Sequence, residues 1–162
     1  QGSGLKVLIP GEADCIAIAG MGASTIISIL EDDTEVAQSA ELLVLQPMAG
    51  AASLRAWLCS HGWQLAAEEL VDDAPHFYEI IAAKRGLAPV YSAAECAVGP
   101  LLLAQKHPLL GKQLERQLAT CRQLLENMGR SERARASEKY KEIEALKAEL
   151  EVLQNGKRSD SK

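Results

Sequence analysis

Apolar residues occur in two kinds of segment along the first sixty residues. Short continuous apolar runs at 14–19 and 42–46 are typical of strands that are buried on both faces of a parallel sheet. Each run is followed by a segment whose apolar residues share one helical face, at 24–30 and 51–61. The order strand, helix, strand, helix predicts a parallel sheet covered by helices.

The pattern changes after residue 62. Residues 63–71 and 77–84 are predicted strands, and a turn at 72–75 separates them. Two strands joined by so short a turn pair antiparallel. We therefore expect an α/β fold whose parallel sheet ends in an antiparallel hairpin.

A predicted loop at 86–100 is followed by two long helical segments. Apolar residues recur in both at intervals of three and four, which is the spacing of a coiled-coil seam. The two seams are Leu114, Leu118, Cys121, Leu125 and Met128, and Ile143, Leu146, Leu150 and Leu153. Gly129 is expected to end the first helix, and Ser131 can cap the second. The seams predict an antiparallel helical hairpin.

These patterns divide the chain into two predicted units. The first covers residues 1–100, and the second, the helical hairpin, covers 101–162 with a polar tail that frays from Asn155. The first unit has four basic and thirteen acidic residues, whereas the second has thirteen basic and nine acidic ones. This split suggests two parts with different roles. Alternatively, a solvated helical surface simply carries more charge of both signs.

Several classes of protein do not fit the sequence. No apolar run reaches the roughly 20 residues of a membrane-spanning helix, and no signal peptide opens the chain. The four cysteines are far apart and form no CxxC motif, so we expect reduced thiols. The three histidines do not cluster with cysteine or aspartate, so no metal site is predicted, and both tryptophans are expected in the core.

The strand at 14–19 would lie at the edge of a sheet built only from these elements, although its composition is that of a central strand. An unprotected apolar edge is an aggregation hazard. We therefore expect the other half of the sheet to be missing from this chain or to come from a partner strand, for which a homodimer is one source.

A glycine turn follows the same strand. Gly20 and Gly22 match the first two glycines of a dinucleotide fingerprint, but Thr25 stands where the third would be, and no P-loop motif is present. Gln46 and Pro47 end the next parallel strand, so both strand ends should open onto one crevice. The glycines either let a ligand approach the backbone or only permit close packing of helix on strand. The residues alone leave these two alternatives open.

An ordered set of motifs resembles the TrmK family of bacterial tRNA adenine-N1 methyltransferases. The motifs are Asp14–Gly22, Leu45–Pro47, Leu54–Leu58, Gly62–Trp63, Phe77–Ile81, Gly99–Leu103 and Lys106–Pro108. The terminal coiled coil follows in the order of the family. The resemblance implies the C-terminal half of a class I, Rossmann-like methyltransferase sheet, S-adenosylmethionine as cofactor and tRNA as partner. It implies methylation of N1 of the adenine at position 22.

The resemblance also implies roles for individual residues. It places Asp14, Gly20, Met21 and Gly22 in the catalytic crevice and Ser3, Gly4, Ala19 and Gly20 at the cofactor. Gln46, Pro47 and Tyr78 would contact the target nucleotide, Tyr78 by stacking. Methyl transfer to a ring nitrogen needs positioning and a route for a proton rather than a protein nucleophile.

Two departures from the family are visible. Its N-terminal segment, which carries the main grip on the methyl donor, does not precede Gly2, so we expect this chain to be incomplete for activity. Ala23 and Met48 stand where the family tends toward glycine and asparagine.

Basic residues of the second unit could reach RNA phosphates. They are Lys106, Arg116, Arg122, Arg130, Arg133, Arg135 and Lys139. The alternative is that they form ordinary ion pairs along their helices. The resemblance therefore implies a cytoplasmic tRNA methyltransferase, and the alternative is a non-catalytic assembly or RNA-binding module that uses the coiled coil.

Overall fold

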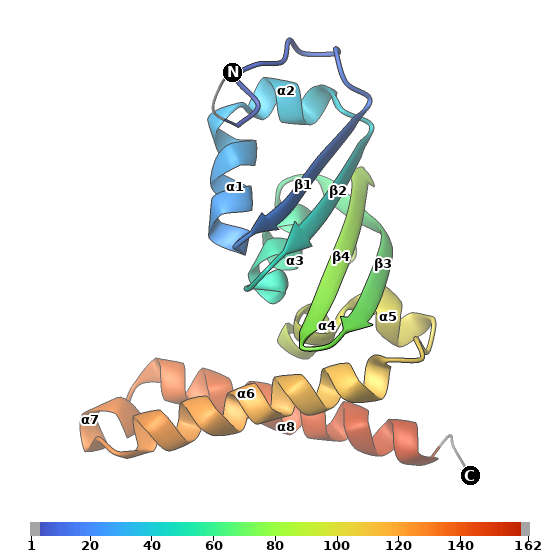
Figure 1. Ribbon diagram of the computed structural model, residues 1–162. Helices are drawn as coiled ribbons and strands as arrows, with labels where there is room; N and C mark the ends of the chain where they lie inside the picture. The colour runs from blue at the N-terminus through green and yellow to red at the C-terminus, as the bar shows by residue number, and fades with distance from the viewer. Residues whose placement is uncertain (1–3, 160–162) are drawn as a thin grey trace.

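The computed structural model describes residues 4–159 (Figure 1). The predicted cofactor residue Ser3 lies outside this range. The described part of the chain contains no helix long and apolar enough to cross a membrane.

A four-stranded mixed sheet forms the centre of the first unit. Its strands are β1 (Cys15–Met21), β2 (Leu42–Pro47), β3 (Trp63–Asp73) and β4 (His76–Arg85), and their spatial order is β1-β2-β4-β3 (Figure 1). β1 and β2 are parallel, whereas β4 is antiparallel to both β2 and β3. The predicted parallel pair and the antiparallel hairpin are confirmed. In the sheet, β4 lies between β2 and β3, its partner in the hairpin.

Helices cover one face of the sheet. They are α1 (Ala23–Asp32), α2 (Thr34–Ser39), which was not predicted, and α3 (Ala51–Ser60). Ile26 and Leu30 of α1 and Leu54 and Leu58 of α3 are at most 2% exposed. They belong to one core cluster with the alternate strand residues Ile16, Ile18, Leu43 and Leu45. This cluster holds the helices on the sheet.

The opposite face of β1 is exposed. Cys15, Ala17 and Ala19 face solvent, so the prediction of burial on both faces is wrong for β1 in the described residues. The reason is that no described helix covers this face. Among the described strands, β2 alone pairs with β1. The predicted edge position of β1 is confirmed among residues 4–159.

The predicted loop at 86–100 contains a helix. α4 (Ala93–Val98) begins at Ser92, whose hydroxyl accepts from the Glu95 backbone N–H, while the Glu95 carboxylate accepts from the Ser92 N–H. α5 (Pro100–Ala104) follows directly after Gly99, which has a φ of 109°. The alanine, glycine and proline content of this segment concealed two short helices.

The helical hairpin consists of α6 (Leu110–Gly129), α7 (Glu132–Arg135) and α8 (Glu138–Ser159), and α6 and α8 lie side by side (Figure 1). Their predicted seams are confirmed, because Leu114, Leu118, Cys121, Ile143 and Leu150 are buried in one cluster. Ser131 caps α7 rather than the long second helix. The helix α8 continues to Ser159, so the predicted fraying from Asn155 is wrong.

The second core cluster also includes residues of the sheet. Leu70 of β3 is buried in it, and Phe77 of β4 packs against it. Through these two residues the root of the hairpin is seated on the end of the β3–β4 ribbon (Figure 1).

Candidate active site

The parallel strands β1 and β2 end side by side and form one edge of the candidate site. Ala19 pairs with Gln46, and Met21 pairs with Pro47 after an irregularity in the register. The Gly20 N–H donates to Oε1 of Gln46 at 2.9 Å, and the Met48 N–H donates to the Met21 carbonyl at 2.8 Å. The structure therefore brings the predicted residues Ala19–Gly22, Gln46 and Pro47 together.

The glycines of the turn are not required by packing. A Cβ built at either Gly20 or Gly22 would meet no atom within 4 Å. Gly20 has a φ of 77°, which disfavours other residues, whereas Gly22 has an ordinary φ of −68° and occupies the N-cap of α1 without a side-chain cap. Of the two alternatives for the turn, close packing of helix on strand is thus excluded, and open space beside the backbone remains.

Two methionines border this open space. Met21 is 41% exposed and Met48 is 54% exposed, and Nε2 of Gln46 donates to the Met48 sulfur at 3.3 Å. Gln46 therefore contacts both the glycine turn and the methionine rim. Flexible thioether side chains of this kind adapt to flat apolar ligands.

A pocket of about 180 Å³ lies next to the crevice, between the end of β2, the β3–β4 turn and α6. It is lined by Gln46, Met48, Pro75, His76, Phe77, Tyr78 and Arg116. The His76 and Tyr78 rings lie 5.7 Å apart at a tilt of 33°. Three residues predicted to contact RNA, Gln46, Tyr78 and Arg116, thus line one pocket.

Arg116 is the cation of this pocket. Its guanidinium carbon lies 4.3 Å from the centre of the Phe77 ring, and Nζ of Lys112 lies 5.6 Å from the same centre. Lys112 also pairs with Asp72 at 2.5 Å. No carboxylate within residues 4–159 forms an ion pair with Arg116.

Two residues predicted in the site lie elsewhere. Asp14 precedes the first residue of β1, at the end opposite the glycine turn, and its carbonyl accepts from the Glu41 and Leu42 N–H groups. Gly4 lies against Ile29, with 3.5 Å between its Cβ position and Cγ2 of that residue. Asp14 is therefore separated from the crevice by the seven residues of β1, which span about 20 Å. Gly4 contacts the second half of α1 instead of the glycine turn.

The remaining basic residues are spread along the second unit. Lys106 lies in the turn between α5 and α6, Arg122 is exposed on α6, and Arg133 and Arg135 are exposed on α7. Arg130 pairs with Glu126 at 3.7 Å and Lys139 with Glu142 at 3.2 Å. Helical ion pairing, the alternative reading of these charges, thus holds for the last two.

A buried network that the sequence did not reveal centres on Arg55, which is 0% exposed. Its guanidinium donates to Glu68 at 2.5 Å, to Glu79 at 2.9 Å and to the Cys96 carbonyl at 2.9 Å. The other oxygen of Glu68 accepts from the Leu101 N–H at 2.7 Å. The network ties α3, β3 and β4 to α4 and α5. The sequence does contain one sign of this network: Arg55 and Glu68 stand at positions where the helix and strand patterns favour apolar residues.

A second tie joins the hairpin root to β3. Nε2 of His107 lies 2.5 Å from Oε1 of Glu69. This hydrogen bond, together with one from the Leu70 N–H, holds the pKa of Glu69 below its ordinary value. The root of α6 is therefore held on the ribbon by charged contacts as well as by the second core cluster.

Three thiols, those of Cys59, Cys96 and Cys121, are not activated for nucleophilic chemistry. Burial raises the pKa of Cys59, Cys96 and Cys121, and all four cysteines are free. A raised pKa keeps a thiol protonated.

What the site offers is a backbone turn open to a ligand, an amide, apolar rims and a cation, which is an arrangement for positioning substrates.

The chain is similar to known proteins in sequence and in structure. The profile of the TrmK family, tRNA (adenine(22)-N(1))-methyltransferase, matches residues 1–155. The tRNA (adenine(22)-N(1))-methyltransferase of Bacillus subtilis (strain 168) is 30% identical over 158 residues, which cover 94% of this chain. The chain spans 66% of the length of that relative.

Solved structures show the same likeness. The crystal structure of B. subtilis TrmK matches with a TM-score of 0.81 at 29% identity, over 95% of this chain and 68% of that one. The Streptococcus pneumoniae protein Sp1610 in complex with S-adenosyl-L-methionine matches with a TM-score of 0.76 at 26% identity, over 94% and 66%. The mixed sheet with its helices is therefore a Rossmann-like methyltransferase fold, and this chain belongs to the TrmK family.

Proposed function

We propose that this protein transfers a methyl group from S-adenosylmethionine to N1 of adenine 22 in tRNA. The observation that carries the proposal is the open space beside Gly20 and Gly22, at the shared end of β1 and β2. Family membership supports it, as does the likeness to a structure that contains S-adenosyl-L-methionine. A tRNA substrate also supports a cytoplasmic location.

The donor would lie against the Ala19–Gly20 backbone, and the adenine would enter between Met21 and Gln46–Pro47. Here the lone pair of N1 attacks the methyl carbon, and the sulfur leaves with the bonding electrons as a neutral thioether. Such a displacement is accelerated by holding the two reactants in line, which needs no protein nucleophile. The alkylated ring gains a positive charge, which the net negative first unit tolerates.

The pocket at the root of the hairpin would hold the RNA around the extruded adenine. An enzyme that modifies a paired or stacked base must take that base out of the stack. Tyr78 and His76 offer rings on which a neighbouring base can stack, and Arg116 offers a cation to a phosphate. Lys106, Arg122, Arg130, Arg133, Arg135 and Lys139 would extend this contact along the hairpin.

Transfer of a labelled methyl group tests the proposal. The purified product of the whole gene that encodes this chain is given labelled S-adenosylmethionine and an unmodified tRNA transcript with adenine or guanine at position 22. We expect label only in the transcript with adenine, because guanine has a proton on N1 and no lone pair to attack. Equal labelling of both transcripts would contradict the proposal.

We also propose that a further strand pairs with the open edge of β1. The support is the exposed apolar face of this edge strand and its single neighbour among the described strands. Light scattering at two concentrations tests whether a second copy supplies the strand. A dimer that dissociates on dilution would support a second copy, and a monomer at both concentrations would exclude it.

A further inference from the structure

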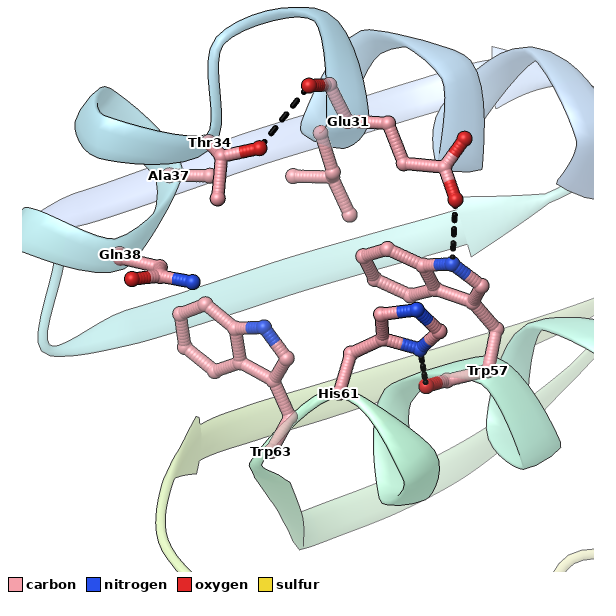
Figure 2. Close-up of a pocket in the computed structure, with 8 residues that line it drawn as sticks. Glu31, Thr34, Ala37, Gln38, Trp57, His61 and Trp63 are labelled. Carbon is pink, nitrogen blue, oxygen red and sulfur yellow. Dashed lines mark hydrogen bonds between the residues drawn. The ribbon is translucent and has the colours of Figure 1, made fainter.

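A second pocket lies at the end of the sheet opposite the crevice. It is enclosed by the last turn of α1, the short helix α2, the last turn of α3 and the start of β3 (Figure 2). Its volume is about 120 Å³. Because α1 and α3 begin at the crevice and end at this pocket, ten residues or about 15 Å of helix separate the two places.

Three aromatic rings form the wall of this pocket. His61 stacks on Trp57, with 4.3 Å between ring centres and 15° between the ring planes. Nδ1 of His61 lies 2.8 Å from the Trp57 carbonyl, which fixes the imidazole in this orientation. Trp63 stands beside them and is only 2% exposed (Figure 2). The wall is therefore an aromatic surface. Trp63 belongs to the core as predicted, whereas Trp57 packs against the core with a half-buried ring that also lines this opening.

The rim of the pocket carries hydrogen-bond acceptors. The Glu31 carboxylate accepts from the Trp57 indole N–H at 2.8 Å through one oxygen, while the side-chain nitrogen of Gln38 points toward the opening (Figure 2). Glu31 is the one carboxylate among the residues that line the pocket, and Asp32, Asp33 and Glu35 follow it in the sequence without lining it. The guanidinium carbon of Arg85 lies 5.0 Å from the centre of the Trp63 ring.

We propose that this pocket binds a guanidinium group. Indole rings and a carboxylate together recognise cations, and indole is the strongest of the aromatic partners. A flat guanidinium can stack on the exposed His61 ring while its N–H groups donate to the second oxygen of Glu31. The contact between Arg85 and Trp63 is an instance of this pairing within the chain itself. The volume of about 120 Å³ suits such a head group better than a purine.

The guanidinium could belong to a small molecule or to an arginine side chain of another protein. Tryptophan fluorescence distinguishes these sources and tests the proposal, because both tryptophans of the chain line this pocket. The probes are N-acetyl-arginine amide, its neutral isostere N-acetyl-citrulline amide, agmatine, and a five-residue peptide with a central arginine. We expect saturable quenching by the arginine probe and at least ten-fold weaker binding of the citrulline probe. Tighter binding of the peptide than of agmatine would indicate a protein source, and the reverse a small molecule.

Two variants locate the binding. Glu31→Gln removes the charge but keeps an oxygen that accepts from Trp57, and we expect it to weaken the arginine probe at least five-fold. Glu35→Gln removes a neighbouring charge that does not line the pocket and should change the affinity less than two-fold. Equal binding of arginine and citrulline probes, no saturable quenching, or equal effects of the two variants would each overturn the proposal.

Discussion

Arg116 joins the hairpin to the candidate site, since it lies on α6 and lines the pocket next to Gln46. Arg116→Gln should weaken tRNA binding about five- to ten-fold and lower the slope of log affinity against log salt by about one, because one phosphate contact is lost. Filter binding over a series of salt concentrations measures both quantities. Lys147→Gln on α8, where Lys147 pairs with Glu151 at 3.4 Å, is the control and should leave the slope unchanged. An unchanged slope for Arg116→Gln would remove this residue from the RNA contact.

Glu69 makes stability depend on pH. Its pKa is lowered in the folded state, chiefly by the hydrogen bond with His107, so the charged form stabilises the fold above the ordinary glutamate pKa of about 4.3. This contribution is lost as the pH falls through the lowered folded-state pKa. Urea unfolding of the wild type and Glu69→Gln between pH 6 and pH 3 should show a difference in unfolding free energy that shrinks toward pH 3. A difference that stays constant over this range would contradict the assignment.

The sequence predicted the positions of some functional residues and not of others. Gln46, Tyr78 and Arg116 were predicted, and they line one pocket. Asp14 was misplaced because resemblance gives an order along the chain and not the end of the strand at which a side chain lies. Arg55 was missed because its partners Glu68 and Glu79 are 13 and 24 residues away, and no local pattern reports such a pairing.

At the scale of elements, the Arg55 network holds α4 and α5 on the sheet. Arg55→Met should lower the unfolding free energy by about 3–5 kcal/mol, because it leaves the buried Glu68 without its partner. Chemical denaturation measures this loss. The double variant Arg55→Met with Glu68→Met should recover part of it, since no buried charge then remains at position 68. A loss below about 1 kcal/mol for the single variant would show that the network is not a stabilising tie.

Elements with a regular spacing of apolar residues were predicted from the sequence, whereas the short helices were not. The strands and the two long helices were predicted from their regular apolar spacing, and they differ from the structure mainly at their ends. α2, α4 and α5 have five or six residues each, too few for a helical period to show. Ser92 and Glu95, at capping-box spacing, were the one local sign of α4.

The whole molecule joins an acidic unit to a basic helical hairpin. We propose the boundary near residue 100 that the sequence predicts, with α4 and α5 as the connection. The second core cluster reaches back to Leu70 and Phe77, so the hairpin is packed on the sheet rather than tethered by a loop. This packing keeps Arg116 beside the crevice. The position of the hairpin on the sheet could not be predicted, because the apolar seams of α6 and α8 show that the two helices pair but not where the pair packs.

The central claim is that the space beside Gly22 receives the substrates. Gly22→Asn tests it most directly, since asparagine is a favourable N-cap, the backbone there is ordinary and no atom lies within 4 Å of the added Cβ. Gly129→Asn, at an equally open position on the hairpin, is the matched control. Both variants should keep the melting temperature within a few degrees.

The measurement is the reverse-transcription stop that N1-methyladenine leaves at position 22, read on tRNA from cells whose own gene carries either variant. We predict a strong stop for the wild type and Gly129→Asn, and a stop reduced at least ten-fold for Gly22→Asn at equal protein level. An undiminished stop in Gly22→Asn cells, or no stop at position 22 in wild-type cells, would contradict the account.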